Sequence, residues 1–236
     1  MGLDVYVGSL TRYYAGDWET IVQKHGREQG YQVMVVRPNM PADADKETGR
    51  IRSAVLLWRH HLSQGLGADI RRPLDWDESD TAPYFTDKPA WDCYASLLLW
   101  AAYAEHPDLV RPLECIEDYS TDPAYQRCAN PDYASTYSQL LRNVEVWLPC
   151  DFPFTFIAGD PAGNQMTFGS SIALLSQLEE LNRKTWNASN ATVSEWRRHC
   201  AKHLSPMEEG AKFAFAIMSG LARDSVEHRL VMKLDY

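Results

Sequence analysis

Alternating hydrophobic and polar residues predict several strands along this chain. Residues 3–8 and 31–37 alternate and are rich in β-branched and aromatic side chains, which is typical of strands. Residues 152–158 and 165–168 show strand patterns on either side of a turn at 159–164, so we expect a β-hairpin there. The sequence therefore predicts a small sheet of about four strands.

Apolar residues at helical spacing predict about seven helices packed on this sheet. Residues 94–104 are apolar on every side, which indicates a buried central helix that Pro89 opens. The last helix has a clear start signal, with Ser205 as N-cap, Pro206 at the first position and Glu208 completing a capping box. The other expected helices cover residues 17–29, 46–64 and 133–147, a segment that Ser170 or Ser171 caps, and residues 194–204. No linker divides the chain, so we expect a single α+β domain spanning residues 1–236.

The charge of the chain favours a protein partner over a nucleic acid. Its 23 lysines and arginines stand against 32 aspartates and glutamates, which gives a formal net charge of −9. The basic residues form no cluster that would hold phosphates, so we expect no nucleic-acid binding. A negative surface attracts a basic protein, such as a toxin or an enzyme, through electrostatic steering.

Cysteine usage and hydropathy indicate a cytoplasmic protein with no membrane contact. The five cysteines include no Cys-x-x-Cys pair, and no apolar leader follows the first residues. The longest apolar run, at residues 94–104, is about half as long as a bilayer crossing requires.

An acidic and aromatic segment at residues 75–92 is the strongest candidate for a binding surface. Its 18 residues include five aspartates, a glutamate, two tryptophans, a tyrosine and a phenylalanine. Carboxylates beside rings can bind a cationic side chain, a sugar or a basic loop, because the rings add area and cation–π attraction to the charge. The candidate binding residues are Asp75, Trp76, Asp77, Asp80, Tyr84, Asp87, Trp91 and Asp92. The alternative is a structural role, with Asp87 capping the central helix and the tryptophans covering its start.

A second candidate patch follows the first expected strand. Arg12, Tyr13 and Tyr14 lie there, beside Asp17 and Trp18. The end of an N-terminal strand is where α/β folds often place binding sites. Arg12 is suited to holding an anion or to pairing with one of the acids of residues 75–92, whereas the alternative for the rings is packing in a corner between strand and helix.

Motifs of the readily recognised enzyme and metal-binding classes are absent. The chain has no Gly-x-Ser-x-Gly, no phosphate loop, no Gly-x-Gly-x-x-Gly and no His-Glu-x-x-His. His199 and His203 share one helical face with Glu195 and are the nearest approach to a metal site, but a solvated face beside basic residues explains them as well. Asp75, Asp77 and Ser79 begin like a calcium loop that then lacks its glycine and its final glutamate. We therefore expect no metal and no cofactor.

Three stretches of the sequence carry a family resemblance. The opening Met1-Gly-Leu-Asp-Val-Tyr-Val-Gly-Ser-Leu-Thr-Arg-Tyr-Tyr14, the stretch Tyr84-Phe-Thr-Asp-Lys-Pro89 and the closing Val226-Glu-His-Arg229 resemble a group of uncharacterised bacterial proteins of similar length. The resemblance implies a bacterial source and no particular activity. In size and charge alone, the chain is also similar to the immunity proteins of bacterial toxin systems.

Two functions follow as hypotheses. The first is a non-catalytic, acidic protein-binding protein of the immunity or antitoxin-like kind. The second is a hydrolase for a small molecule or carbohydrate, with Asp77, Asp87 or Asp92 in a pocket beside Tyr13, Trp76 and Trp91. In the hydrolase, Asp77 and Asp92 would form an acid/base pair about 5–9 Å apart. The sequence names no catalytic residue beyond these alternatives.

Overall fold

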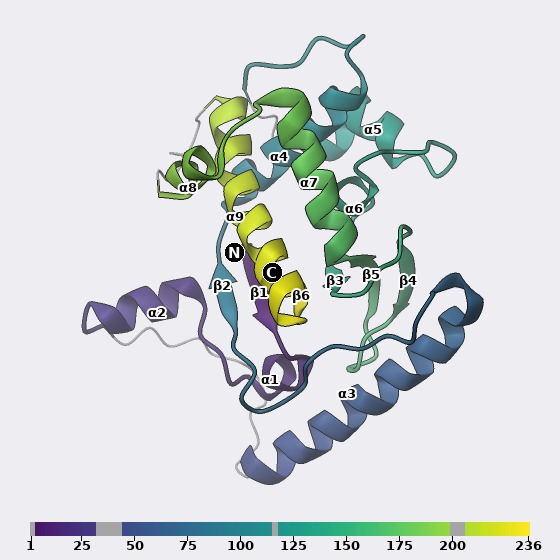
Figure 1. Ribbon diagram of the computed structural model, residues 1–236. Coiled ribbons are helices and arrows are strands. Elements are labelled where there is room, and N and C mark those ends of the chain that lie inside the picture. Colours follow the sequence, from purple (N-terminus) through teal and green to yellow (C-terminus); the bar gives the residue numbers. More distant parts are fainter. Residues whose placement is uncertain (1–2, 32–43, 115–117, 199–205) are drawn as a thin grey trace.

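The computed structural model describes residues 3–31, 44–114, 118–198 and 206–236 (Figure 1). In these segments the fold is α+β, as the sequence predicts, with six strands and nine α-helices. The expected strand at residues 31–37 lies outside the described residues except for Tyr31. The expected cap Ser205 lies outside them, as do His199 and His203.

The described strands form one mixed sheet in the order β2-β1-β6-β3-β5-β4. Neighbouring strands are antiparallel except β3 and β5, which are parallel. The strands are β1 (Asp4–Gly8), β2 (Phe85–Asp87), β3 (Val146–Leu148), β4 (Phe156–Gly159), β5 (Gln165–Ser170) and β6 (Val231–Asp235). The expectation of about four strands is therefore wrong: β2 and β3 are too short to show an alternating pattern, and β6 was not expected.

One face of the sheet is covered by three helices, α4 (Trp91–Glu105), α7 (Ser171–Thr185) and α9 (Met207–His228) (Figure 1). Nearly all of α4 is buried, from Cys93 to Tyr103, which confirms the predicted central helix. It packs along α9, whose own apolar residues are buried from Met207 to Ala222. Together with the inward residues of β1 and β6, these helices form the larger hydrophobic core.

The opposite face is covered by α1 (Leu10–Ala15) and the long helix α3 (Ala44–Leu66). Side chains from both helices meet Phe168 of β5 and Val231 of β6 in a second, smaller core. Residues 70–76 add Ile70, Leu74 and Trp76 to this core. The chain between α3 and β2 is therefore part of the fold as well as a connection.

The remaining helices are α2 (Ile21–Glu28), α5 (Pro123–Ala129), α6 (Ser138–Leu141) and α8 (Asn190–Arg198). The helix expected at 17–29 is shorter than predicted, because Thr20 and not Asp17 caps it as α2. The α1 helix before it was not expected, and Gly16 ends α1 in the left-handed conformation. The helix expected at 133–147 is mostly absent: α6 has four residues, and β3 follows Asn143, whose φ is 52°. No helix of the described segments is long and apolar enough to cross a membrane.

Candidate functional site

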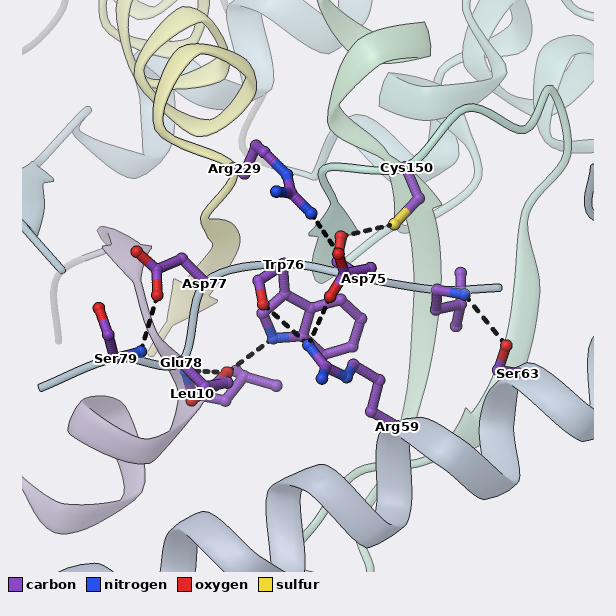
Figure 2. Close-up of polar contacts among 11 residues, drawn as sticks. Leu10, Arg59, Ser63, Asp75, Trp76, Asp77, Glu78, Ser79, Cys150 and Arg229 are labelled. Atoms are coloured by element: carbon purple, nitrogen blue, oxygen red, sulfur yellow. Dashed lines mark hydrogen bonds and ion pairs between the residues drawn. The ribbon is translucent and has the colours of Figure 1, made fainter. Parts of the chain in front are cut away.

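Asp75, at the start of the acidic and aromatic segment, is tied to two parts of the fold (Figure 2). Its carboxylate lies 3.3 Å from a guanidinium nitrogen of Arg59 on α3 and also accepts a hydrogen bond from Arg229, which caps the end of α9. The Cys150 thiol donates to its carbonyl oxygen at 3.5 Å. Residues 75–82, which we call the strap, therefore join α3 to the end of α9 through Asp75.

Trp76 and Glu78 are buried within this strap, with 3% and 5% of their surfaces exposed. The Trp76 indole N–H donates to Glu78 Oε1 at 2.6 Å, and Arg59 lies over the indole ring. Both carboxylate oxygens of Glu78 accept backbone N–H groups at the start of α1, from Leu10 at 2.9 Å and Thr11 at 2.8 Å (Figure 2). Glu78 thus caps a helix 67 residues away, where the first turn has unpaired N–H groups and a positive dipole end. This role of Glu78 was not predicted, because the local sequence carries no signal for it.

Asp77 and Asp80 each have a partner within the fold. The Asp77 carboxylate accepts the Ser79 N–H at 2.8 Å, and this bond lowers the pKa of Asp77. A catalytic acid would need the opposite shift. Asp80 is exposed and pairs with Arg52 at 3.2 Å.

Arg12 holds the backbone of the same segment. Its guanidinium donates to the carbonyl oxygens of Ala82 at 2.6 Å and Asp80 at 3.1 Å, and it lies 5.2 Å from the centre of the Tyr84 ring. Asp17 is its partner in a longer ion pair of 3.7 Å. The contacts of Arg12 are therefore with carbonyl groups of the expected binding segment and with Asp17.

Tyr13 and Tyr14 point from α1 to two different carboxylates. The Tyr13 hydroxyl donates to Asp235 at 2.5 Å, and the Tyr14 hydroxyl donates to Asp160 at 2.7 Å. Between these groups lies Lys233, which is 3% exposed and has its Nζ 5.2 Å from the centre of the Tyr13 ring. Burial lowers the pKa of Lys233 against the opposing effect of Asp160 and Asp235.

The second half of the segment lies far from the first. Asp87, on β2, pairs with Arg197 of α8 at 2.7 Å and accepts the Lys88 N–H, whereas α4 has no side-chain cap. Asp92 is the second residue of α4, next to Cys93. The Cα of Cys93 packs against Gly210 near the start of α9, since a Cβ added to Gly210 would lie 3.4 Å from it. Asp77 instead donates its N–H to the Arg229 carbonyl at the end of α9. These two positions on α9 are about 28 Å apart along the helix axis, so the structure does not bring Asp77 and Asp92 together as an acid/base pair.

A cavity of about 330 Å³ opens beside the start of α4. Its walls are aromatic, with Trp91 and Tyr94 from α4, Tyr119 from a neighbouring 3₁₀ turn and Tyr236 after β6. The rest of the lining is four aliphatic residues and three polar ones, Leu98, Leu140, Val144 and Leu234 with Asn143, Glu145 and Thr167. Trp91 and Tyr236 pack edge to face with ring centroids 5.4 Å apart and are partly exposed, at 38% and 63%.

Among the described residues that line the cavity, Glu145 has the one side-chain carboxylate, and no side chain is basic. Glu145 is rigidly held: Oε2 accepts the Thr167 N–H at 3.0 Å, Oε1 accepts the Tyr236 hydroxyl at 2.7 Å, and its backbone pairs with β5 and β6. Burial and this bond raise the pKa of Tyr236 to about 12. Burial also raises the pKa of Tyr94 and Tyr119, so the tyrosines of the cavity are neutral at physiological pH.

Of the residues that the sequence singled out, Trp91 lines this cavity. Glu145 and Tyr236 were missed, because their neighbours in sequence give no sign that β5 and β6 bring them to the start of α4. Comparison of the chain with protein-family models, curated proteins and solved structures returns no significant match.

Proposed function

We propose that this protein is a non-catalytic binding protein, of the immunity or antitoxin-like kind, that receives a basic side chain of a protein partner in the cavity between Trp91 and Tyr236. The observation that carries the proposal is the combination, among the described lining residues, of four aromatic rings with one fixed side-chain carboxylate and no basic side chain. A lysine or arginine side chain matches such a site, because its stem packs on rings while its charge gains cation–π attraction and a charge-assisted hydrogen bond.

Glu145 is suited to this role because its bonds within the chain leave acceptor capacity unused. A carboxylate has about four lone-pair sites. The Thr167 N–H and the Tyr236 hydroxyl occupy two of them. An incoming ammonium or guanidinium can take the others without breaking either bond.

The hydrolase alternative finds less support in the same cavity. Glycoside hydrolysis by an acid and a second carboxylate requires two such groups about 5–9 Å apart. Glu145 has the single side-chain carboxylate among the described lining residues, and Asp77, Asp87 and Asp92 are not among them.

The exposed acids of the strap have a different place in this proposal. Asp75 and Asp80 keep 62% and 73% of their side-chain surfaces exposed although each pairs with an arginine. Such charges act mainly on the rate of association with a basic partner. Replacement of Asp75, Asp77 and Asp80 by alanine is therefore expected to lower the on-rate, whereas a change in the cavity is expected to raise the off-rate.

The cavity can be tested with single basic residues before any partner is known. Nα-acetyl-arginine amide and Nα-acetyl-lysine amide are titrated into the protein, with the neutral citrulline and norleucine amides as matched ligands. The summed fluorescence of the eight tryptophans detects binding, and NMR shift changes of assigned cavity residues, Trp91 among them, locate the site. We expect Kd in the millimolar range, about −4 kcal/mol, for the cationic ligands and weaker binding of the neutral ones.

Glu145→Gln is the decisive variant. It is expected to weaken the cationic ligands about 10-fold or more, because it removes a charge-assisted bond, and to leave the neutral ligands unchanged. Glu179→Gln makes the same change of charge at an exposed position of α7 and is expected to have no effect. Equal binding of arginine and citrulline amides, or an unchanged Kd in Glu145→Gln, would refute the proposed site.

A further inference from the structure

A separate cluster of metal-ligating side chains lies at the other end of α4. A carboxylate oxygen of Glu105, a ring nitrogen of His106 and the Cys128 sulfur all lie within 4.8 Å of one another. Glu105 is the last residue of α4, about 21 Å along the helix axis from Trp91 at the cavity. The cluster is therefore independent of the binding site proposed above.

The end of α4 explains how two consecutive residues can face the same point. Adjacent side chains in an α-helix point about 100° apart. His106 has already left the helix, with φ −121° and ψ 67°, so its ring is free of that restriction. Cys128 comes from the last turn of α5, which packs against α4.

Glu105 is oriented by neighbours that leave one oxygen for a ligand. Its Oε1 accepts the Ser135 hydroxyl at 2.8 Å and the Tyr137 N–H at 2.9 Å. Its Oε2 accepts the thiol of Cys128 at 3.7 Å, and this bond is the one that a metal ion would replace when the thiol loses its proton. Two ligand atoms at tetrahedral angles, 2.3 Å and 2.1 Å from one zinc ion, would be about 3.6 Å apart. Sulfur and oxygen are thus already at the separation that a shared ion requires.

His106 provides the second observation. The side chain is 7% exposed, and its Nε2 is buried without a hydrogen-bond partner. A buried polar atom of this kind costs free energy unless something satisfies it. Its ring packs against Tyr133 at 5.1 Å between centroids, which leaves its edge as the polar part that needs a partner.

A nucleophilic role for the thiol is the competing explanation, and its burial speaks against it. Cys128 is 0% exposed and lies in the larger hydrophobic core. Reactive cysteines lie in partly exposed, electropositive surroundings, whereas a metal ligand needs no access for substrate.

We propose that Glu105, His106 and Cys128 bind one Zn²⁺ ion. Sulfur, imidazole nitrogen and carboxylate oxygen together form a donor set typical of zinc, and the thiolate and carboxylate balance its charge. Binding forms bonds from the metal to all three atoms and releases the thiol proton to solvent. The fourth tetrahedral position goes to water. The ion joins the end of α4 to α5, so it stabilises the fold.

Cobalt substitution tests this site on the intact protein. Metal-free protein, prepared with a chelator, is titrated with Co²⁺ alone. We expect one equivalent to give a near-ultraviolet thiolate-to-cobalt band and intense visible bands of tetrahedral cobalt, and Zn²⁺ to abolish both. Cys128→Ser is expected to lose the thiolate band. Cys93 is also buried but lies on α4, so Cys93→Ser is the matched control, which should keep the thiolate band.

Affinity provides a second readout. In competition with a chromophoric chelator, His106→Phe, which keeps a ring against Tyr133, is expected to weaken Zn²⁺ binding about 100-fold or more. Ser135→Ala, which removes a bond to the ligand Glu105, is expected to weaken it about 10- to 100-fold. Circular dichroism checks that each variant is folded. Wild-type protein without a thiolate-to-cobalt band, or a Cys128→Ser variant that retains it, would overturn the proposal even if the other variants fail to fold.

Discussion

Glu78→Gln is the sharpest test of how residues 75–82 are held. The wild-type carboxylate accepts three hydrogen bonds, with Leu10 and Trp76 on Oε1 and Thr11 on Oε2. Glutamine has a single carbonyl oxygen, which can keep the two bonds of Oε1. Its NH₂ group would then face the Thr11 N–H, and the negative charge at the start of α1 would be lost.

The expected loss of stability follows from these contacts. A hydrogen bond to a charged group contributes about 1.5–3 kcal/mol, and removal of a helix cap costs about 0.5–2 kcal/mol. These effects overlap, because one carboxylate makes both contributions. We therefore expect Glu78→Gln to lower the free energy of unfolding by about 2–4 kcal/mol.

Urea unfolding followed by circular dichroism measures this loss, with Glu179→Gln as the control of equal charge change at an exposed site. The control is expected to stay within about 0.5 kcal/mol of the wild type. Trp76→Phe, alone and combined with Glu78→Gln, adds a double-mutant cycle whose coupling energy is expected to be about 0.5–3 kcal/mol. If Glu78→Gln unfolds like the control, the carboxylate does not hold the strap.

Two further predictions concern stability. Lys233→Met is expected to change the pH dependence, because burial lowers the pKa of Lys233 in the folded state. Between that lowered pKa and the ordinary value of about 10.4, the unfolded chain binds a proton that the folded chain lacks, so wild-type stability gains a contribution as pH rises. The free energy of unfolding of the variant minus that of the wild type, measured in urea, should therefore fall from pH 7 to pH 10. A difference that stays constant over this range would contradict the prediction. Gly8→Ala is expected to cost about 1–3 kcal/mol, because a Cβ there would lie 2.1 Å from the hydroxyl of the buried Tyr6. Gly65→Ala in α3, where nothing lies within 4 Å, is the control that should leave the thermal midpoint unchanged or raise it, and equal midpoints for both variants would refute the clash.

The fold could be predicted from sequence where a period is long enough to be visible. The β1 strand, the hairpin of β4 and β5, the buried α4 and the α7 helix capped by Ser170 all follow their apolar patterns. The β2 and β3 strands have three residues each, which is too short for alternation to appear. In β6, the central residue is a buried lysine, and no pattern of apolar residues indicates that burial.

The contacts of the acidic segment depend on tertiary structure that local sequence does not encode. Charge and aromatic content mark residues 75–92 as unusual, and they do not reveal that Arg59 and Arg229 meet Asp75 from opposite sides. The partner of Glu78 is the start of a helix 67 residues earlier in the chain. Sequence alone therefore does not distinguish a carboxylate that binds a ligand from one that caps a distant helix.

Trp76 and Glu78, near one end of residues 75–92, are buried, whereas Trp91, near the other end, is partly exposed. Trp76 and Glu78 lie where the segment passes the start of α1. There the indole N–H and the Leu10 N–H both donate to the buried carboxylate of Glu78. Trp91 lies where the same segment enters α4, and there Tyr236 leaves part of both rings in contact with solvent. The acids at one end of the segment therefore hold the fold, and the binding that we propose lies at the other end, where Glu145 comes from a different part of the chain. If this division holds, Glu78→Gln should lower stability without changing the affinity for arginine amide at a temperature where the variant is folded, and Glu145→Gln should do the reverse. A variant that changes both quantities together would show that strap and cavity are coupled.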